Sequence, residues 1–173
     1  MSIIESLSTG AIGSLIASAL FLFIMYRHRP KLEISPNIAK TTYDGKTVYA
    51  IKVINSGSRD AFAIRAEFLM IEPWVVSGGI GSNILQFSLV RDQWFILNPT
   101  SKVGDTFGSN FEFITNEDLE GDWVNHENSY LLFRVHAQDV LSGFARVFVH
   151  QYYSRKAIIE GRFAKGASME ISE

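Results

Sequence analysis

The clearest structural signal in this chain is a pair of segments, Tyr130-Leu-Leu-Phe-Arg-Val-His-Ala137 and Phe144-Ala-Arg-Val-Phe-Val-His-Gln-Tyr152, on either side of Asp139-Val-Leu-Ser-Gly143. Apolar and polar residues alternate through much of both segments, which is the period of a half-buried β-strand. The joining segment carries Asp and Gly, residues that tight turns favour. The stretch 130–152 therefore predicts a β-hairpin.

Shorter runs of the same kind extend upstream from this hairpin. They are rich in Val, Ile and Phe, and polar or glycine-bearing segments separate them. The segments 55–60 and 77–82 have the composition of a turn and a loop, and 115–120 has that of a short capped helical turn. Expected strands lie at 31–35, 47–54, 61–71, 84–90, 94–97 and 106–114. This pattern predicts an all-β domain over 32–173, an immunoglobulin-like two-sheet sandwich.

A different pattern precedes this domain. No charged residue occurs from Ser6 to Tyr26, and the run Gly10-Ala-Ile-Gly-Ser-Leu-Ile-Ala-Ser-Ala-Leu-Phe-Leu-Phe-Ile-Met-Tyr26 is almost entirely apolar or small. Together with the uncharged residues before it, this run forms a helix of about 30 Å at about 1.5 Å per residue, the thickness of a bilayer's hydrocarbon core. We expect a short tail at 1–9, a transmembrane helix at 10–26 and a basic juxtamembrane linker at 27–31.

Three alternatives explain this segment less well. A cleaved signal peptide needs Lys or Arg before its apolar run, and residues 1–9 carry only the α-amino group and the acidic Glu5. An interfacial helix needs a charged face, which this segment lacks. A core helix of a soluble domain seldom stays uncharged for so long. The sequence therefore favours a membrane span.

The charges at the two ends of the span predict its orientation. Arg27, Arg29 and Lys31 follow it, and no basic side chain precedes it. Because basic flanks stay on the cytoplasmic side, we expect a single-pass protein of the inner (plasma) membrane, with its N-terminus outside and its C-terminal domain cytoplasmic. Tyr26 lies at the expected headgroup level, and Pro30 stops the helix beyond it. The linker cations are expected to contact membrane lipids, anionic ones in particular.

Small residues recur at four-residue spacing along the span, at Gly10, Ser14 and Ser18. Such a stripe lets two helices approach closely in lipid, so we expect helix–helix packing there and a homo-oligomer. Small residues are also common in membrane helices that do not associate, and that alternative stays open.

The composition points away from several function classes. The formal net charge is −2 and no basic face is clustered, which gives no sign of a nucleic-acid surface. No cysteine is present, so disulfides and thiolate metal sites are excluded.

His136 and His150 flank the predicted hairpin and could neighbour each other, but strand histidines are more often structural than ligands. The acidic stretch 117–127 lacks the pattern of a calcium-binding loop. We expect no catalytic residue, no metal, no cofactor and no enzyme activity.

Aromatic residues are numerous, and most of them alternate within the predicted strands, where a sandwich places its core. Trp74 and Trp123 are the exceptions, because both fall in predicted loops. An exposed tryptophan in a loop can mark a contact surface or the headgroup layer, and we take these two as the candidate contact surface.

Short motifs at both ends of the domain resemble a known family. The order of an apolar helix, a basic linker, Ile34-Ser35, Asp44-Gly-Lys46, Val53-Ile-Asn55, Arg59 and Ala66 is similar to the opening of the cytoplasmic immunoglobulin-like domain of inward-rectifier potassium channels. The segments Tyr152-Tyr153 and Ile158-Ile-Glu-Gly-Arg-Phe163 are similar to its closing part. The chain departs from those channels because it carries no second membrane helix, pore helix or Thr-Val-Gly-Tyr-Gly-like filter.

This resemblance implies a cytosolic sandwich that assembles side by side around a membrane axis, with Arg27, Arg29 and Lys31 against anionic lipid. Our leading hypothesis is a non-enzymatic membrane protein whose sandwich acts as an oligomeric binding, sensing or assembly module. One alternative is an accessory subunit of a channel or transporter complex, with a protein partner in the membrane. Another is an effector that perturbs the membrane when the domain senses a ligand.

Overall fold

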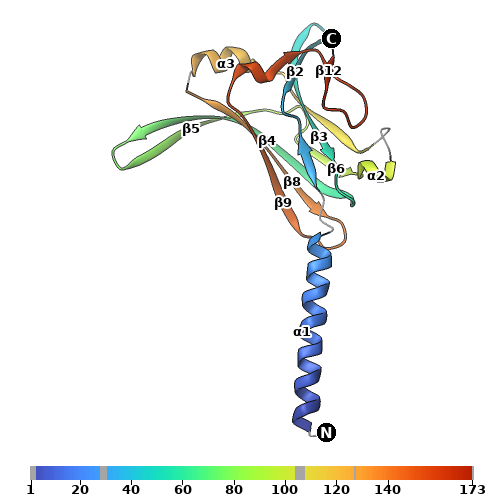
Figure 1. Cartoon of the computed structure of the whole chain (residues 1–173). Helices are drawn as coiled ribbons and strands as arrows, with labels where there is room; N and C mark the ends of the chain where they lie inside the picture. The colour runs from blue at the N-terminus through green and yellow to red at the C-terminus, as the bar shows by residue number, and fades with distance from the viewer. Residues whose placement is uncertain (1–2, 28–30, 104–107, 127, 173) are drawn as a thin grey trace.

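The computed structural model describes residues 3–27, 31–103, 108–126 and 128–172 (Figure 1). Helix α1 (Ile3–Arg27) projects from a β-rich domain as a stalk. It contains no proline and is rich in Leu, Ile and Ala, and Arg27 in its last turn complements the helix dipole. The helix begins seven residues before the predicted span and ends one residue after it.

Among the described residues, the first five-stranded sheet is built around a long central strand, β3. Its strands are β1 (Leu32–Ile34), β2 (Ile38–Tyr43), β3 (Lys46–Asn55), β7 (Asn110–Thr115) and β10 (Ile158–Glu160). Strands β1 and β2 pair antiparallel with one edge of β3, and β7 pairs antiparallel with its other edge. Strand β10 pairs in parallel with β2. Asp44 and Gly45 both have positive φ, as a tight two-residue hairpin turn requires.

The second five-stranded sheet in the described chain is built around β4. Its strands are β4 (Ala61–Val76), β5 (Gly79–Phe87), β6 (Gln93–Leu97), β8 (Tyr130–Asp139) and β9 (Ala145–Tyr152). Strand β8 lies between β4 and β9, and β5 and β6 share the other edge of β4. The hairpin predicted for 130–152 is thereby confirmed.

The two sheets face each other across one hydrophobic core. The rings of Phe113 in β7 and Phe133 in β8 lie 5.6 Å apart between centroids, which joins the sheets directly. Residues at alternate positions of both sheets fill this core, among them Tyr49, Ile51, Val53, Ala66, Phe68, Met70, Val135 and Phe148. The expected two-sheet arrangement agrees with this packing, and the chain combines a β-rich domain with an apolar N-terminal helix.

Short elements complete the domain. They are α2 (Thr100–Val103), α3 (Leu119–Asn125), the 3₁₀ turn η1 (Arg155–Ala157), β11 (Arg162–Phe163) and β12 (Ile171–Ser172). The β11–β12 pair lies on the outer face of the first sheet, where Phe163 packs on Ala39 and Ala50 in a second, smaller cluster. Helix α3 begins later than the helical turn predicted at 115–120, because Asp118 is its N-cap and accepts a hydrogen bond from Gly121 N at 3.0 Å.

The segment predicted as a glycine-rich loop at 77–82 is for the most part strand. Strand β4 continues to Val76, the chain turns at Ser77 and Gly78, and β5 begins at Gly79. Trp74 pairs with Gly81, and a Cβ on Gly81 would lie 2.7 Å from the indole. The glycine therefore makes room for the ring within a hairpin. Figure 1 shows this β4–β5 arm extending sideways beyond the sandwich.

Candidate functional site

Helix α1 exposes its apolar surface from Gly10 to its end at Arg27. The 18 residues Gly10–Arg27 have a mean hydropathy of 1.6, and none of them is buried within the described structure. Length and composition allow this helix to cross a membrane, and a signal sequence near an N-terminus has the same properties. A core helix would be covered by the rest of its domain, and α1 is not.

The candidate packing residues Gly10, Ser14 and Ser18 all lie on the exposed part of α1. No atom of the described structure comes within 4 Å of the position that a Cβ would take at Gly10. The stripe is thus open to a second helix, and its role in association stays a prediction.

The basic flank begins where α1 ends. Tyr26 and Arg27 are exposed in the last turn of the helix, and Arg29 lies outside the described residues. Lys31 is exposed and its Nζ lies 3.5 Å from Glu33 Oε1, a surface ion pair. The main chain of Lys31 is anchored more firmly, because its carbonyl accepts a hydrogen bond from Ser56 N at 2.9 Å. The contact of these cations with lipid stays a prediction.

Ser56 belongs to the turn between β3 and β4, which a buried amide holds in place. Asn55 Nδ2 donates to Arg59 O at 2.7 Å and to Leu97 O at 2.8 Å, and Asn55 Oδ1 accepts from Gly57 N at 3.1 Å. Both donors of the amide and its acceptor are therefore used, as a fully buried side chain requires. This network fixes the position of Arg59.

Arg59 links that turn to the one between β8 and β9. Its Nε lies 3.0 Å from Oδ2 of Asp139, whose side chain is 2% exposed. The contact is an ion pair without the alignment of a hydrogen bond. Asp139 Oδ1 accepts from Leu141 N at 3.1 Å and from Ser142 N at 2.6 Å. Burial by itself would raise the pKa of Asp139, but the hydrogen bonds from Ser142, the charge of Arg59 and the Leu141 N–H together hold that pKa below its ordinary value.

The β8–β9 turn, residues 140–144, carries apolar side chains that the core does not use. Val140 is 58% exposed and Leu141 is 63% exposed. Figure 1 shows the turn at the end of the domain where α1 joins it. The sequence assigned this segment to a turn without singling out its apolar tip. The sequence did contain a signal for this exposed tip, because two adjacent apolar residues lie between the turn-forming Asp139 and Gly143.

The two candidate contact tryptophans lie in different environments. Trp74 is 50% exposed and stands on the β4–β5 arm, so it lies in a strand instead of a loop, and its role in contact stays a prediction. Trp123 is only 4% exposed, lies in α3 and donates its indole N–H to Ser129 O at 3.1 Å. The prediction that Trp123 belongs to an exposed surface is therefore wrong, because α3 turns this ring into the core.

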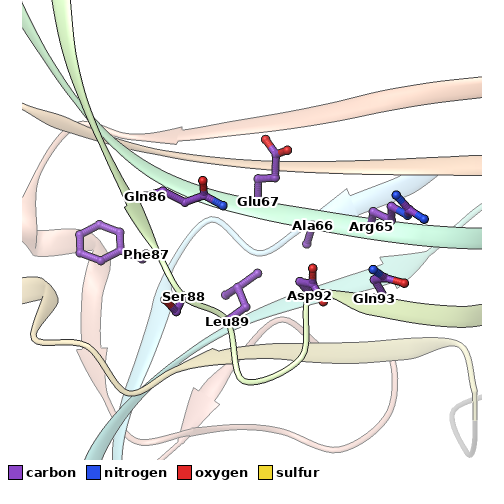
Figure 2. Close-up of a pocket in the computed structure, with 9 residues that line it drawn as sticks. All are labelled: Arg65, Ala66, Glu67, Gln86, Phe87, Ser88, Leu89, Asp92 and Gln93. Atoms are coloured by element: carbon purple, nitrogen blue, oxygen red, sulfur yellow. The ribbon is translucent and has the colours of Figure 1, made fainter.

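A polar hollow of about 480 Å³ lies beside β4 (Figure 2). Its walls come from β4, the end of β5 and the loop that leads to β6, as Figure 2 shows for Glu67, Gln86 and Asp92. Glu67 forms an ion pair with Arg134 on β8, and the main chain of Ser88 donates to Glu117 Oε1 at 2.6 Å. These contacts tie the lining groups to β8 and to the segment between β7 and α3. They do not assemble a nucleophile with a base.

A second hollow of about 540 Å³ lies on the outer face of the first sheet, next to β11. Apolar residues such as Val48, Ile114 and Phe163 line much of it. Nearby, Lys52 is buried and its Nζ donates to Ala164 O at 2.6 Å. Burial lowers the pKa of Lys52, against the opposing charge of Glu112. The hollow is a candidate binding groove for an apolar group.

The histidines of the hairpin do not come together. His136 pairs with Val147 and His150 with Phe133, so they lie three positions apart along the ladder and on opposite faces of the sheet. The sequence left their proximity open, and the structure separates them, because an odd offset in register reverses the face. Among the described residues, no group of three or more His, Asp or Glu is placed to hold a metal ion.

The described acidic residues of 117–127 have separate structural roles. Glu120 pairs with Lys40 at 2.5 Å and accepts a hydrogen bond from Tyr49 at 3.1 Å, while Asp118 caps α3. Glu117, Asp118 and Glu120 line one shallow hollow beside Lys40, but each carboxylate bonds to different partners.

No protein-family profile and no curated protein sequence matches this chain. Among solved structures it is similar to the crystal structure of Spo0M, a sporulation control protein from Bacillus subtilis, at 10% sequence identity and a TM-score of 0.38. The similarity covers 72% of this chain and 49% of that protein, so this chain spans about half the length of the structure it matches. A similarity of this degree carries no conclusion about activity or partners.

Proposed function

We propose that this chain is a non-enzymatic single-pass membrane protein whose cytosolic, immunoglobulin-like sandwich acts as an oligomeric binding, sensing or assembly module. The observation that carries the proposal is the exposed apolar surface of α1, joined by a few residues to a domain with a complete core of its own. A domain that is already packed has no need of this helix for folding.

The membrane is the solvent that suits α1 best. Its backbone is hydrogen-bonded internally, as a lipid environment demands, and its side chains from Gly10 to Tyr26 are uncharged. In water the same surface would expose a continuous apolar cylinder, which soluble monomers avoid. Arg27 and Lys31 on the domain side support a cytoplasmic location of the sandwich.

The oligomer and the immunoglobulin-like class belong to the proposal as well. The resemblance to the cytoplasmic domain of inward-rectifier potassium channels supports side-by-side assembly about a membrane axis. The open Gly10, Ser14 and Ser18 stripe offers a helix surface for it. The groove beside Phe163 supports a binding or sensing role of the sandwich.

The β4–β5 arm favours a second candidate function, that of an accessory subunit in a membrane complex. The arm carries exposed Trp74, Val75, Ile80 and Ile84. Its outer strand β5 contains no charged residue and no proline, the devices that natural edge strands use to avoid pairing. Such an arm suits a protein partner. Co-purification from native membranes in mild detergent separates the two functions, because an accessory subunit brings a partner in fixed stoichiometry and a self-contained module does not.

Carbonate extraction and protease protection test the membrane proposal. We expect the full chain with a C-terminal tag to stay in the membrane pellet at alkaline pH, and the tag to resist protease added outside intact cells. In a Leu15→Lys, Phe21→Lys variant the helix should leave the membrane, whereas matched Tyr43→Lys, Val75→Lys substitutions on the exposed domain surface should not release it. Release of the unaltered chain, or loss of the tag to external protease, would overturn the proposal.

A further inference from the structure

The tip of the β8–β9 turn carries an apolar pair that folding does not require. Asp139 supplies the side-chain acceptor for the turn, Gly143 supplies the positive φ, and Gly143 N donates to Asp139 O at 2.9 Å. The main chain of Leu141 donates to Asp139, but the side chains of Val140 and Leu141 have no such role and are exposed. Turn tips in soluble domains favour Gly, Pro, Asn, Asp and Ser at such positions.

The position of the tip is limited by the length of the chain. Arg27 ends α1, and Lys31 follows four residues later, so their Cα atoms lie at most about 14 Å apart. Lys31 bonds to Ser56 in the β3–β4 turn, and Arg59 of that turn pairs with Asp139, the residue just before the tip. The chain therefore connects the helix end to Lys31, and direct contacts connect Lys31 to the tip, whatever the angle between helix and domain.

The tip itself is uncharged. Residues 140–145 contain no charge, the acidic Asp139 precedes them in its ion pair with Arg59, and the basic Arg146 follows them. Lys31 and Arg59 connect to the tip through the contacts above, and each lies beside a carboxylate, Glu33 and Asp139 respectively. An uncharged apolar tip next to the exposed Arg146 suits the interface of an anionic bilayer.

We propose that the β8–β9 turn dips into the lipid headgroup layer next to α1, with Val140 and Leu141 as its inserted side chains. This rests on the proposed function, because α1 has to span the bilayer to bring the turn to it. The headgroup regions are about 5–8 Å thick on each side of the hydrocarbon, so a turn connected to Lys31 through direct contacts can reach them. The domain is then held at the membrane in two ways, by its chain connection to α1 and by the inserted turn. Together they restrict its orientation.

Lipid is the occupant that the position favours. A soluble partner or a second copy would have to approach a tip that lies beside the membrane-entry point of α1. Lipid is already present there at high local concentration. Figure 1 shows the tip near the C-terminal end of α1.

The absence of native cysteine gives a direct test. Single-cysteine variants of the full chain at Leu141, Ser18 and Lys46, each labelled with a polarity-sensitive fluorophore, are reconstituted into vesicles of mixed neutral and anionic lipid. Quenching by lipids with a nitroxide on the acyl chain reports contact with the membrane. Leu141 and Lys46 are both exposed in the domain, and Figure 1 shows the β2–β3 turn that ends at Lys46 on the far side from α1.

We expect strong quenching at Ser18, clear quenching with a blue-shifted emission at Leu141, and none at Lys46. A Val140→Cys variant should repeat the result of Leu141. If Ser18 is quenched and the two tip sites are not, the insertion is wrong while the membrane span stands. If Ser18 is not quenched either, the span itself fails. Shielding of Leu141 that appears only at high protein-to-lipid ratio would assign the tip to a second copy and overturn the proposal.

Discussion

At the scale of single residues, Trp74 and Trp123 show how one side chain acts differently in two environments. Trp123 is buried in α3 with its indole N–H bonded to Ser129 O, so Trp123→Ala should leave a cavity and an unpaired carbonyl. We expect it to lower the free energy of unfolding by about 3–5 kcal/mol. The measurement is urea unfolding of the full chain in mild detergent.

The matched substitution is Trp74→Ala, which removes a half-exposed ring from the arm. It should cost less than about 1 kcal/mol, because little apolar area leaves the core. An equal loss for the two variants would show that the arm packs onto the domain in solution and would contradict its description as a free contact surface.

The lowered pKa of Asp139 predicts how the stability of the fold depends on pH. Its pKa is lower in the folded protein than in the unfolded chain, so the unfolded state takes up the proton first as the pH falls. The stability that the ionised carboxylate contributes is therefore complete above its unfolded pKa of about 3.9 and is lost as the pH falls through the folded pKa. Asp139→Asn should cost about 1–3 kcal/mol at neutral pH, and the difference from the unaltered chain should shrink below about pH 4.

The control for this prediction is Glu33→Gln, which removes the exposed ion pair with Lys31. It should change the free energy of unfolding by no more than about 0.5 kcal/mol, because surface pairs contribute little. A difference between Asp139→Asn and the unaltered chain that stays constant from pH 7 to pH 3 would mean that the carboxylate charge is not what holds the turn.

The environment of single residues was only partly predictable from sequence. Both tryptophans lie in segments with polar or glycine-bearing neighbours, which suggested loops for both. The burial of Trp123 depends on Ser129 and on α3 packing over the open edge of the core, contacts that local composition does not report. Asn55 and Asp139 hold the β3–β4 and β8–β9 turns through partners that include Leu97, 42 positions from Asn55, and Arg59, 80 positions from Asp139, so no local motif marked them.

At the scale of elements, the C-terminal hairpin, which β11 and β12 form, depends on a single glycine. Gly161 has φ +130°, and a Cβ there would lie 2.5 Å from Ser172 O in β12. Gly161→Ala should therefore separate β11 from β12 and uncover Ala39 and Ala50, at a cost of about 1–3 kcal/mol. Hydrogen exchange of the last twelve residues is the direct measurement, and it should become much faster.

Gly79→Ala is the control for that substitution. Gly79 begins β5, no positive φ is found there, and open space surrounds the position of its Cβ. We expect unchanged exchange in the C-terminal hairpin and a change in stability within about 0.5 kcal/mol. If Gly161→Ala behaves like Gly79→Ala, the hairpin is not held by the close approach to Ser172.

Elements with local pairing were predictable, and those with distant partners were not. The 130–152 hairpin has alternation and a turn in one continuous stretch, and it forms as expected. Strand β10 is three residues long and pairs in parallel with β2, about 120 residues earlier in the chain. Neither its length nor its neighbours signal a strand. The segment 77–82 of the arm was taken for a loop because glycine usually interrupts strands, whereas Gly81 here accommodates Trp74.

At the scale of the whole molecule, the fold places its possible contacts at distinct points. The Gly10, Ser14 and Ser18 stripe lies on the exposed part of α1. The β8–β9 turn lies at the helix end of the domain, and the β4–β5 arm extends sideways (Figure 1). A protein held at the membrane by α1 diffuses in two dimensions, so weak contacts between copies act at a high effective concentration. Self-association through the helix would bring neighbouring domains together without a large interface between them.

The helix stripe can be tested by enlarging its side chains while α1 stays uncharged. Substitution of Gly10, Ser14 and Ser18 by leucine keeps α1 apolar but prevents close approach of a second backbone. We expect the oligomer measured by native mass spectrometry from detergent or nanodiscs to fall to the monomer, while carbonate extraction still finds the protein in the membrane. Ala19→Leu is the control, because helical geometry places Ala19 on another side of α1, and it should leave the oligomer intact. An oligomer that survives the triple substitution would assign association to the domain or its arm, and a monomeric unaltered chain would remove self-association from the proposed function.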